Sequence, residues 1–167
     1  MTIKKSNLGA APEKRVIKGN EGSPKAQKTA ARLAAVQVLY QMRLNNQDAT
    51  SAVKEFLEHR VGFNLDGDVF VPANPDLLRE IVMGVQERWS DIDAIVTKAL
   101  TDGKKTEVET LLECILRAGV YELIAAANVD AGIIINDYLN VTVGFYDGSE
   151  PKIVNAILDK VAKAVRS

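Results

Sequence analysis

The strongest constraint on the fold is the spacing of apolar residues between Glu107 and Asn128. Eight of them recur there in steps of three, one, three, one, four, three and one: Val108, Leu111, Leu112, Ile115, Leu116, Val120, Leu123 and Ile124. This spacing places them on one wide face of an α-helix, and such a face has to be buried. Ala118 and Gly119 are small enough for a second helix to cross closely. We therefore expect a central helix with other helices packed around it.

Helical spacing continues through most of the chain after residue 22. The expected helices cover residues 24–45, 49–60, 75–89, 91–101, 107–128, 129–143 and 150–165. Ser90 and Asp93 resemble a capping box, which places a helix break before residue 91. Residues 61–75 are rich in turn-forming residues and are expected to form a loop, because the apolar segment 69–71 has no evident partner strand nearby. The sequence therefore predicts an all-α fold with about seven helices.

Length and composition indicate one domain that is preceded by a tail. The 167 residues are 47% hydrophobic and 26% charged, which is typical of a soluble globular domain. We expect residues 1–22 to be a disordered basic tail and residues 23–167 to form a single helical domain. The chain has no apolar run long enough to span a membrane, no secretory signal and one cysteine, so we expect a cytoplasmic location.

Charge is distributed unevenly along the chain. Residues 1–32 contain eight Lys or Arg and two acidic residues, a balance of +6, whereas the remainder has 13 basic and 20 acidic residues, a balance of −7. A basic arm on a mildly acidic body indicates a polyanionic partner. The alternative is a tail that serves only to keep the protein in solution.

The first expected helix begins with an unusual distribution of charge. Ser23 can cap the helix and Pro24 suits its first position. Lys25, Lys28 and Arg32 then form one stripe at i, i+3 and i+7. Cations near the positive end of the helix dipole each cost about 0.3–1 kcal/mol of stability. This arrangement favours binding of an anion at the helix start.

Residues that could support catalysis or bind a metal are scarce. His59 is the single histidine and Cys114 the single cysteine, so a zinc site lacks ligands. Cys114 lies beside the apolar face of the central helix, where a buried thiol is expected, and His59 lies near a helix end. Residues 66–68, Asp-Gly-Asp, lack the spacing of a calcium loop and are expected to form a turn. We therefore expect no enzyme activity, no metal and no cofactor.

Three segments form a recognisable set: ARLAAVQVLYQM at 31–42, ILRAGVYELI at 115–124 and INDYLNVTVGFYDGSEPKIVNAILDKVA at 135–162. Together they resemble the bacterial NusB family of transcription antitermination factors. The resemblance extends in order over about residues 30–162. It implies an all-helical fold of two small packed bundles and an RNA-binding function without catalysis. It further implies binding of the boxA element of ribosomal RNA transcripts together with the NusE ribosomal protein, and antitermination by the RNA polymerase complex.

The resemblance also implies which residues contact RNA. Lys28 and Arg32 occupy matching basic positions at the start of the first helix, and Lys25 lies nearby. A second region includes Phe145 and Lys152, with Ile153 where many members have a phenylalanine that could stack on a base. For the remaining matched or nearby positions a structural role is as plausible as RNA binding: Arg117, Tyr121 and Ser149.

Two other functions fit the same residues. The chain could be an accessory RNA-binding domain for modification of ribosomal RNA, although it lacks a Rossmann-type catalytic half. It could also be a helical adaptor or dimerisation module with an incidental basic tail. A homodimer is a further alternative, because some members of the family self-associate.

Overall fold

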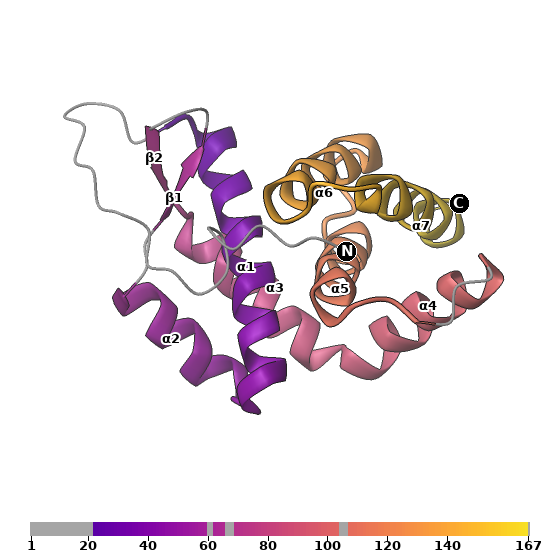
Figure 1. The fold of residues 1–167 in the computed structure, drawn as a ribbon, viewed down its shortest axis with the longest axis horizontal. Coiled ribbons are helices and arrows are strands. Elements are labelled where there is room, and N and C mark those ends of the chain that lie inside the picture. Colours follow the sequence, from indigo (N-terminus) through magenta and orange to yellow (C-terminus); the bar gives the residue numbers. More distant parts are fainter. Residues whose placement is uncertain (1–21, 60–61, 66–68, 104–106, 167) are drawn as a thin grey trace.

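Seven α-helices and one β-hairpin make up the part of the chain that the structure describes (Figure 1). The structure is a computed structural model, and it describes residues 22–59, 62–65, 69–103 and 107–166. The elements in chain order are α1 Pro24–Asn45, α2 Ala49–His59, β1 Gly62–Leu65, β2 Val69–Pro72, α3 Pro75–Glu87, α4 Trp89–Asp102, α5 Thr110–Ala125, α6 Ala131–Phe145 and α7 Glu150–Val165. The predicted all-helical class is confirmed. The expected tail at 1–22 lies outside the described residues except for Gly22.

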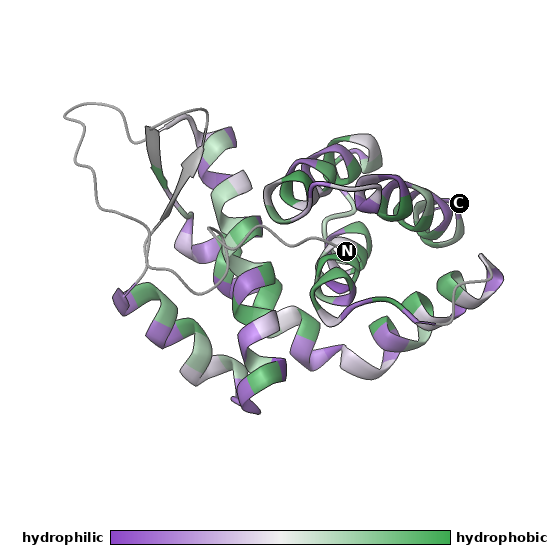
Figure 2. Ribbon diagram, in the orientation of Figure 1, coloured by the Kyte–Doolittle hydropathy of each residue, from purple (hydrophilic) through white to green (hydrophobic). Residues whose placement is uncertain are grey.

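The helices form two groups that meet along α1 and α5. Helices α1, α2 and α3 pack together beside the hairpin, whereas α4, α5, α6 and α7 form the second group (Figure 1). Helix α5 contacts α1 and α3 across the boundary, and α6 also contacts α1. Figure 2 shows that the helices carry both apolar and polar residues, as amphipathic packing requires. The position of α6 beside α1 determines the candidate site described below.

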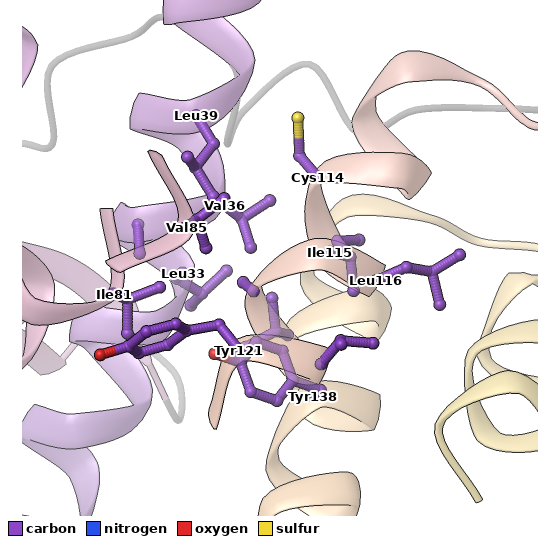
Figure 3. Close-up of a cluster of buried hydrophobic side chains, with 14 of the residues drawn as sticks. Leu33, Val36, Leu39, Ile81, Val85, Cys114, Ile115, Leu116, Tyr121 and Tyr138 are labelled. Atoms are coloured by element: carbon purple, nitrogen blue, oxygen red, sulfur yellow. The ribbon is translucent and has the colours of Figure 1, made fainter. Parts of the chain in front are cut away.

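Helix α5 is central, as its apolar spacing predicts. Twelve of its sixteen residues are buried. Its Ile115 and Leu116 belong to the same core cluster as Leu33 and Val36 of α1 (Figure 3). A Cβ added at Gly119 would lie 2.9 Å from a Leu158 methyl carbon of α7, so the glycine permits the close crossing that the sequence predicts.

The hairpin corrects the prediction that residues 61–75 form only a loop. Strands β1 and β2 pair antiparallel, with Phe63 opposite Val71. The partner of the apolar segment 69–71 is therefore the preceding four-residue segment. Both strands are too short to show strand periodicity, and turn-forming residues surround them. Val71 is buried, and β2 packs against α1, so tertiary contacts support a hairpin that the local pattern does not predict.

The break between α3 and α4 also differs from the prediction. It falls at Arg88 rather than at Ser90, and α4 begins without a side-chain cap. The predicted capping box is wrong because Ser90 and Asp93 both lie inside α4. Asp93 instead accepts a hydrogen bond from Arg117 of α5 at 2.7 Å. The Trp89 ring lies 5.2 Å from the Arg43 guanidinium and 4.4 Å from that of Arg117. Contacts with other helices, rather than a local cap, therefore fix this boundary.

The end of α7 is held against the end of α5. Arg166 donates hydrogen bonds to the carbonyl oxygens of Leu123 at 2.9 Å and Ala126 at 2.8 Å, and also to that of Val129. Carbonyls at a helix C-terminus lack intrahelical partners, so this guanidinium satisfies acceptors that α5 leaves open. As for membranes, no helix in the described ranges has both the length and the apolarity that a transmembrane span requires.

Candidate functional site

The start of α1 has the capping arrangement that the sequence predicts. The Ser23 hydroxyl accepts a hydrogen bond from the Ala26 N–H at 3.1 Å, and Pro24 occupies the first turn. The first turn contains no acidic residue. Lys25 and Lys28 are exposed, and within the described ranges no carboxylate lies within ion-pair distance of either lysine. Both cations are therefore available at the positive end of the helix dipole.

Arg32, the third residue of the basic stripe, points into the protein instead. Its Nε and Nη2 atoms donate to the two Glu122 carboxylate oxygens at 2.8 and 2.9 Å, and its Nη1 donates to Asp137 at 2.6 Å. Only 8% of the residue is exposed. The guanidinium therefore joins α1 to α5 through Glu122 and to α6 through Asp137.

Two hydroxyl groups complete this buried cluster. Tyr138 donates to Glu122, and Thr29 donates to Asp137 at 2.7 Å. Burial by itself lowers the pKa of Arg32, but the hydrogen bond and charge of Glu122 outweigh it, so the pKa is raised. Burial, followed by the charge of Glu122, raises the pKa of Tyr138 well above its usual value. The guanidinium therefore stays charged, and the Tyr138 hydroxyl stays protonated at neutral pH.

A surface groove of ≈ 390 Å³ lies above this cluster. Its lining residues come from α1, the start of α6 and the turn before α6: Lys25, Lys28, Arg32, Val129, Ile133, Asn136, Asp137 and Asn140. Ile133 is 58% exposed, and both asparagines are exposed. The sequence interpretation missed the α6 wall of this groove. The signal was present, because residues 133, 136 and 140 share one helix face, but three consecutive isoleucines suggested a buried segment.

The second predicted RNA-binding region lies at the other end of α6. Lys152 and Ser149 are exposed and Ile153 is partly buried. Phe145 is completely buried, so its ring has no exposed face in this structure. Tyr146 next to it is also buried, and its hydroxyl donates to Glu109 at 2.9 Å. None of these residues lines the groove, so the structure places the two predicted regions at opposite ends of α6.

Arg117 and Tyr121, predicted as either RNA-binding or structural, lie in the interior. Arg117 is 5% exposed and pairs with Asp93 and Glu113. Tyr121 is 7% exposed and packs against Gly84 of α3, and burial raises its pKa. Figure 3 shows the Tyr121 ring beside the core cluster. These contacts support the structural role for both residues.

Cys114 has the environment of a structural thiol rather than of a nucleophile. Cys114 is buried, as predicted, and burial raises the pKa of its thiol to about 12. The thiol is therefore protonated at neutral pH, which disfavours a nucleophilic role. In the described ranges no three His, Cys, Asp or Glu side chains gather in a metal-binding arrangement. The turn predicted at 66–68 lies outside those ranges.

Similar proteins establish the family. The sequence pattern of the NusB family matches residues 29–163. The transcription antitermination protein NusB of Agrobacterium fabrum is 40% identical over 144 residues, which cover 86% of this chain and 87% of that protein. The NusB of Rhizobium rhizogenes is 39% identical over 141 residues, covering 84% of this chain and 88% of that protein.

Solved structures share the fold. T. maritima NusB has a TM-score of 0.65 at 21% identity and covers 84% of this chain and 92% of its own length. A chain in the crystal structure of antitermination factors NusB and NusE with double-stranded RNA has a TM-score of 0.66 at 23% identity, covering 83% of this chain and 97% of its own. This chain therefore belongs to the NusB family of non-enzymatic transcription antitermination factors.

Proposed function

We propose that this protein binds the boxA element of ribosomal RNA transcripts together with a NusE-type small-subunit ribosomal protein, and that the complex promotes antitermination by RNA polymerase. Membership of the family supports this proposal, as does the presence of NusE and RNA beside the structurally similar NusB. The observation that carries it is the pair Lys25 and Lys28 at the groove, exposed and without a carboxylate partner in the described ranges.

The two lysines are placed for phosphate binding rather than for stability. They lie in the first turns of a 22-residue helix, where the dipole favours anions. A bound phosphate would relieve the repulsion between the dipole and the cations. Lys152 and Ser149 at the far end of α6 extend the proposed RNA path, with Ile153 beside them. Arg32 and Phe145 are buried, so in this proposal they hold the helices that carry the surface rather than contact RNA directly.

Binding by this chain alone should be weak. A few lysines give a salt-sensitive affinity, with a log–log slope on the order of −0.7 per phosphate contact for single-stranded RNA. A protein partner that extends the RNA surface raises the affinity by joining two weak sites. The NusE-type protein is therefore expected to raise the affinity for RNA.

A second candidate function is self-association through α6. Ile133 and Val143 are 58% and 52% exposed, so α6 presents two large apolar side chains at the surface. They share the outer face of α6 with Asn136 and Asn140. A homodimer formed through this face would compete with RNA for the same surface. Sedimentation of the protein with and without boxA RNA separates the two functions, because RNA would dissociate such a dimer.

The decisive experiment neutralises the two lysines. Lys25→Gln with Lys28→Gln should weaken boxA RNA binding and lower the magnitude of the salt slope by about 0.7 for each lysine. RNA affinity is measured over a series of salt concentrations, with and without the NusE-type protein. The control, Lys54→Gln with Lys98→Gln on α2 and α4, changes net charge equally at exposed positions away from the groove. Equal slopes for both double variants would contradict the proposal, and absence of wild-type binding would favour the adaptor function.

A further inference from the structure

The floor of the groove carries no net positive charge although an arginine lines it. One guanidinium, from Arg32, lies between the carboxylates of Glu122 and Asp137, which gives a formal charge of −1. The protonated Tyr138 hydroxyl leaves this sum unchanged. Arg32 and Asp137 both line the groove, so a phosphate placed over the floor would meet a negative cluster. Free positive charge is found on Lys25 and Lys28, along the α1 edge.

The opposite wall has the properties of a surface that recognises an uncharged polar ring. Ile133 offers an exposed apolar side chain. Asn136 and Asn140 follow one helical turn apart, at i and i+4, and are both exposed. Across the described part of the chain, neither of their amide groups takes part in a hydrogen bond with another side chain or with the backbone. Each amide therefore has a donor and an acceptor available to a ligand.

We propose that the groove between α1 and α6 binds a single adenine base of the RNA. An asparagine amide accepts from the N6 amino group of adenine and donates to the adjacent ring nitrogen, which is the usual bidentate pairing of asparagine with a base. Ile133 packs against the ring, and the flanking phosphates contact Lys25 and Lys28. The groove, at ≈ 390 Å³, is within the range of about 300–1,000 Å³ typical of small-ligand sites. This inference rests on the proposed RNA-binding function and adds the source of base specificity.

The test pairs a protein variant with an RNA that lacks one chemical group. Asn136→Ala with Asn140→Ala removes both amides, and alanine is the strongest helix former, so the fold is retained. Each adenosine of the boxA RNA is replaced in turn by purine riboside, which lacks the exocyclic amino group. Affinities are measured for the complex with the NusE-type protein. Asn45→Ala, at the exposed far end of α1, is the matched control.

At one adenosine, the effects of the purine riboside replacement and of the double asparagine substitution on the binding free energy should not add. At that position purine riboside weakens wild-type binding at least about fivefold, the lower limit for a bidentate pair. The same replacement has no effect on the double asparagine variant, whose salt slope equals that of the wild type because the lysines remain. The adenine inference alone would be overturned by either of two results. One is that the two losses of affinity add at every adenosine, and the other is that the double asparagine variant binds unmodified RNA as tightly as the wild type. Failure of the wild-type complex to bind boxA RNA would overturn the proposed function as well.

Discussion

Arg32 depends on two carboxylates that come from different helices. Glu122 and Asp137 hold the guanidinium with three hydrogen bonds of 2.6–2.9 Å, and all three residues are less than 10% exposed. Removing one member of a buried ion pair costs about 3–5 kcal/mol, because the other charge remains buried without a partner. Arg32 therefore acts on the groove by holding α6 against α1.

Replacing Arg32 tests this interior role. Arg32→Met should lower the free energy of unfolding by about 3–5 kcal/mol, because it leaves two buried carboxylates uncompensated. Urea denaturation followed by circular dichroism measures the change. Arg32→Lys keeps the charge but cannot satisfy both carboxylates with a fork of donors, so it should be intermediate. A loss below about 1 kcal/mol for Arg32→Met would show that the cluster contributes little to folding.

The sequence does not reveal which members of the basic stripe are exposed and which are buried. Lys25, Lys28 and Arg32 have equivalent positions on one helix face, and only the lysines are exposed. The residues that bury Arg32 are 90 and 105 positions away, so local spacing contains no information about them. The resemblance likewise predicts that Phe145 contacts RNA, although its ring is completely buried. Exposure of a matched residue is thus a property of the tertiary structure.

At the scale of helices, two glycines allow close crossings that differ in how much added side-chain volume they tolerate. A Cβ at Gly84 of α3 would lie 2.1 Å from a carbon of the Tyr121 ring, whereas one at Gly119 of α5 would lie 2.9 Å from the end of Leu158. An aromatic ring is rigid, but a leucine methyl group can move. The α3–α5 crossing therefore tolerates added volume less well than the α5–α7 crossing.

Alanine substitutions should separate these two crossings. Gly84→Ala should destabilise the fold by about 1–3 kcal/mol through overpacking. Gly119→Ala should be nearly neutral, because the helix propensity of alanine offsets a small shift of Leu158. Thermal unfolding of both variants measures the difference. Adding Tyr121→Leu to Gly84→Ala should recover part of the loss, and equal effects of the two single substitutions would contradict this explanation.

Helices were more predictable than the connections between them. The bounds of α1 agree with the sequence because Ser23, Pro24 and Asn46 provide local start and stop signals. The sequence misplaces the α3–α4 break because Arg88 gives no such signal, whereas Asp93 resembles a cap but accepts a hydrogen bond from Arg117. On α6, residue 133 is exposed while 134 and 135 are buried, so hydrophobicity alone did not reveal the groove wall.

For the whole molecule, buried ionisable groups make stability sensitive to alkaline pH. Burial raises the pKa of Cys114 to about 12, and burial together with a nearby carboxylate raises those of Tyr138 and Tyr146. In the unfolded chain these groups ionise near pH 8.5 and pH 10. Above those values the unfolded state loses protons that the folded state retains. The free energy of unfolding must therefore fall as pH rises.

Alkaline titration measures this dependence. From about pH 9 upwards the free energy of unfolding should decrease, by up to about 1.4 kcal/mol per pH unit for each group that is ionised only in the unfolded state. Urea denaturation at a series of pH values gives the slope. Tyr146→Phe should make the decrease shallower above pH 10, because phenylalanine does not ionise. A stability that is independent of pH between 9 and 11 would contradict this prediction.

The contacts of Arg166 have a consequence for how the protein can be handled. This residue binds the carbonyl of Val129, and Val129 lines the groove between α1 and α6. Arg166 thus holds in place one of the residues that line this groove. Loss of Arg166 would remove that support. An affinity tag fused after residue 167 has to leave the Arg166 guanidinium in place if RNA affinities measured on the tagged protein are to represent the native surface.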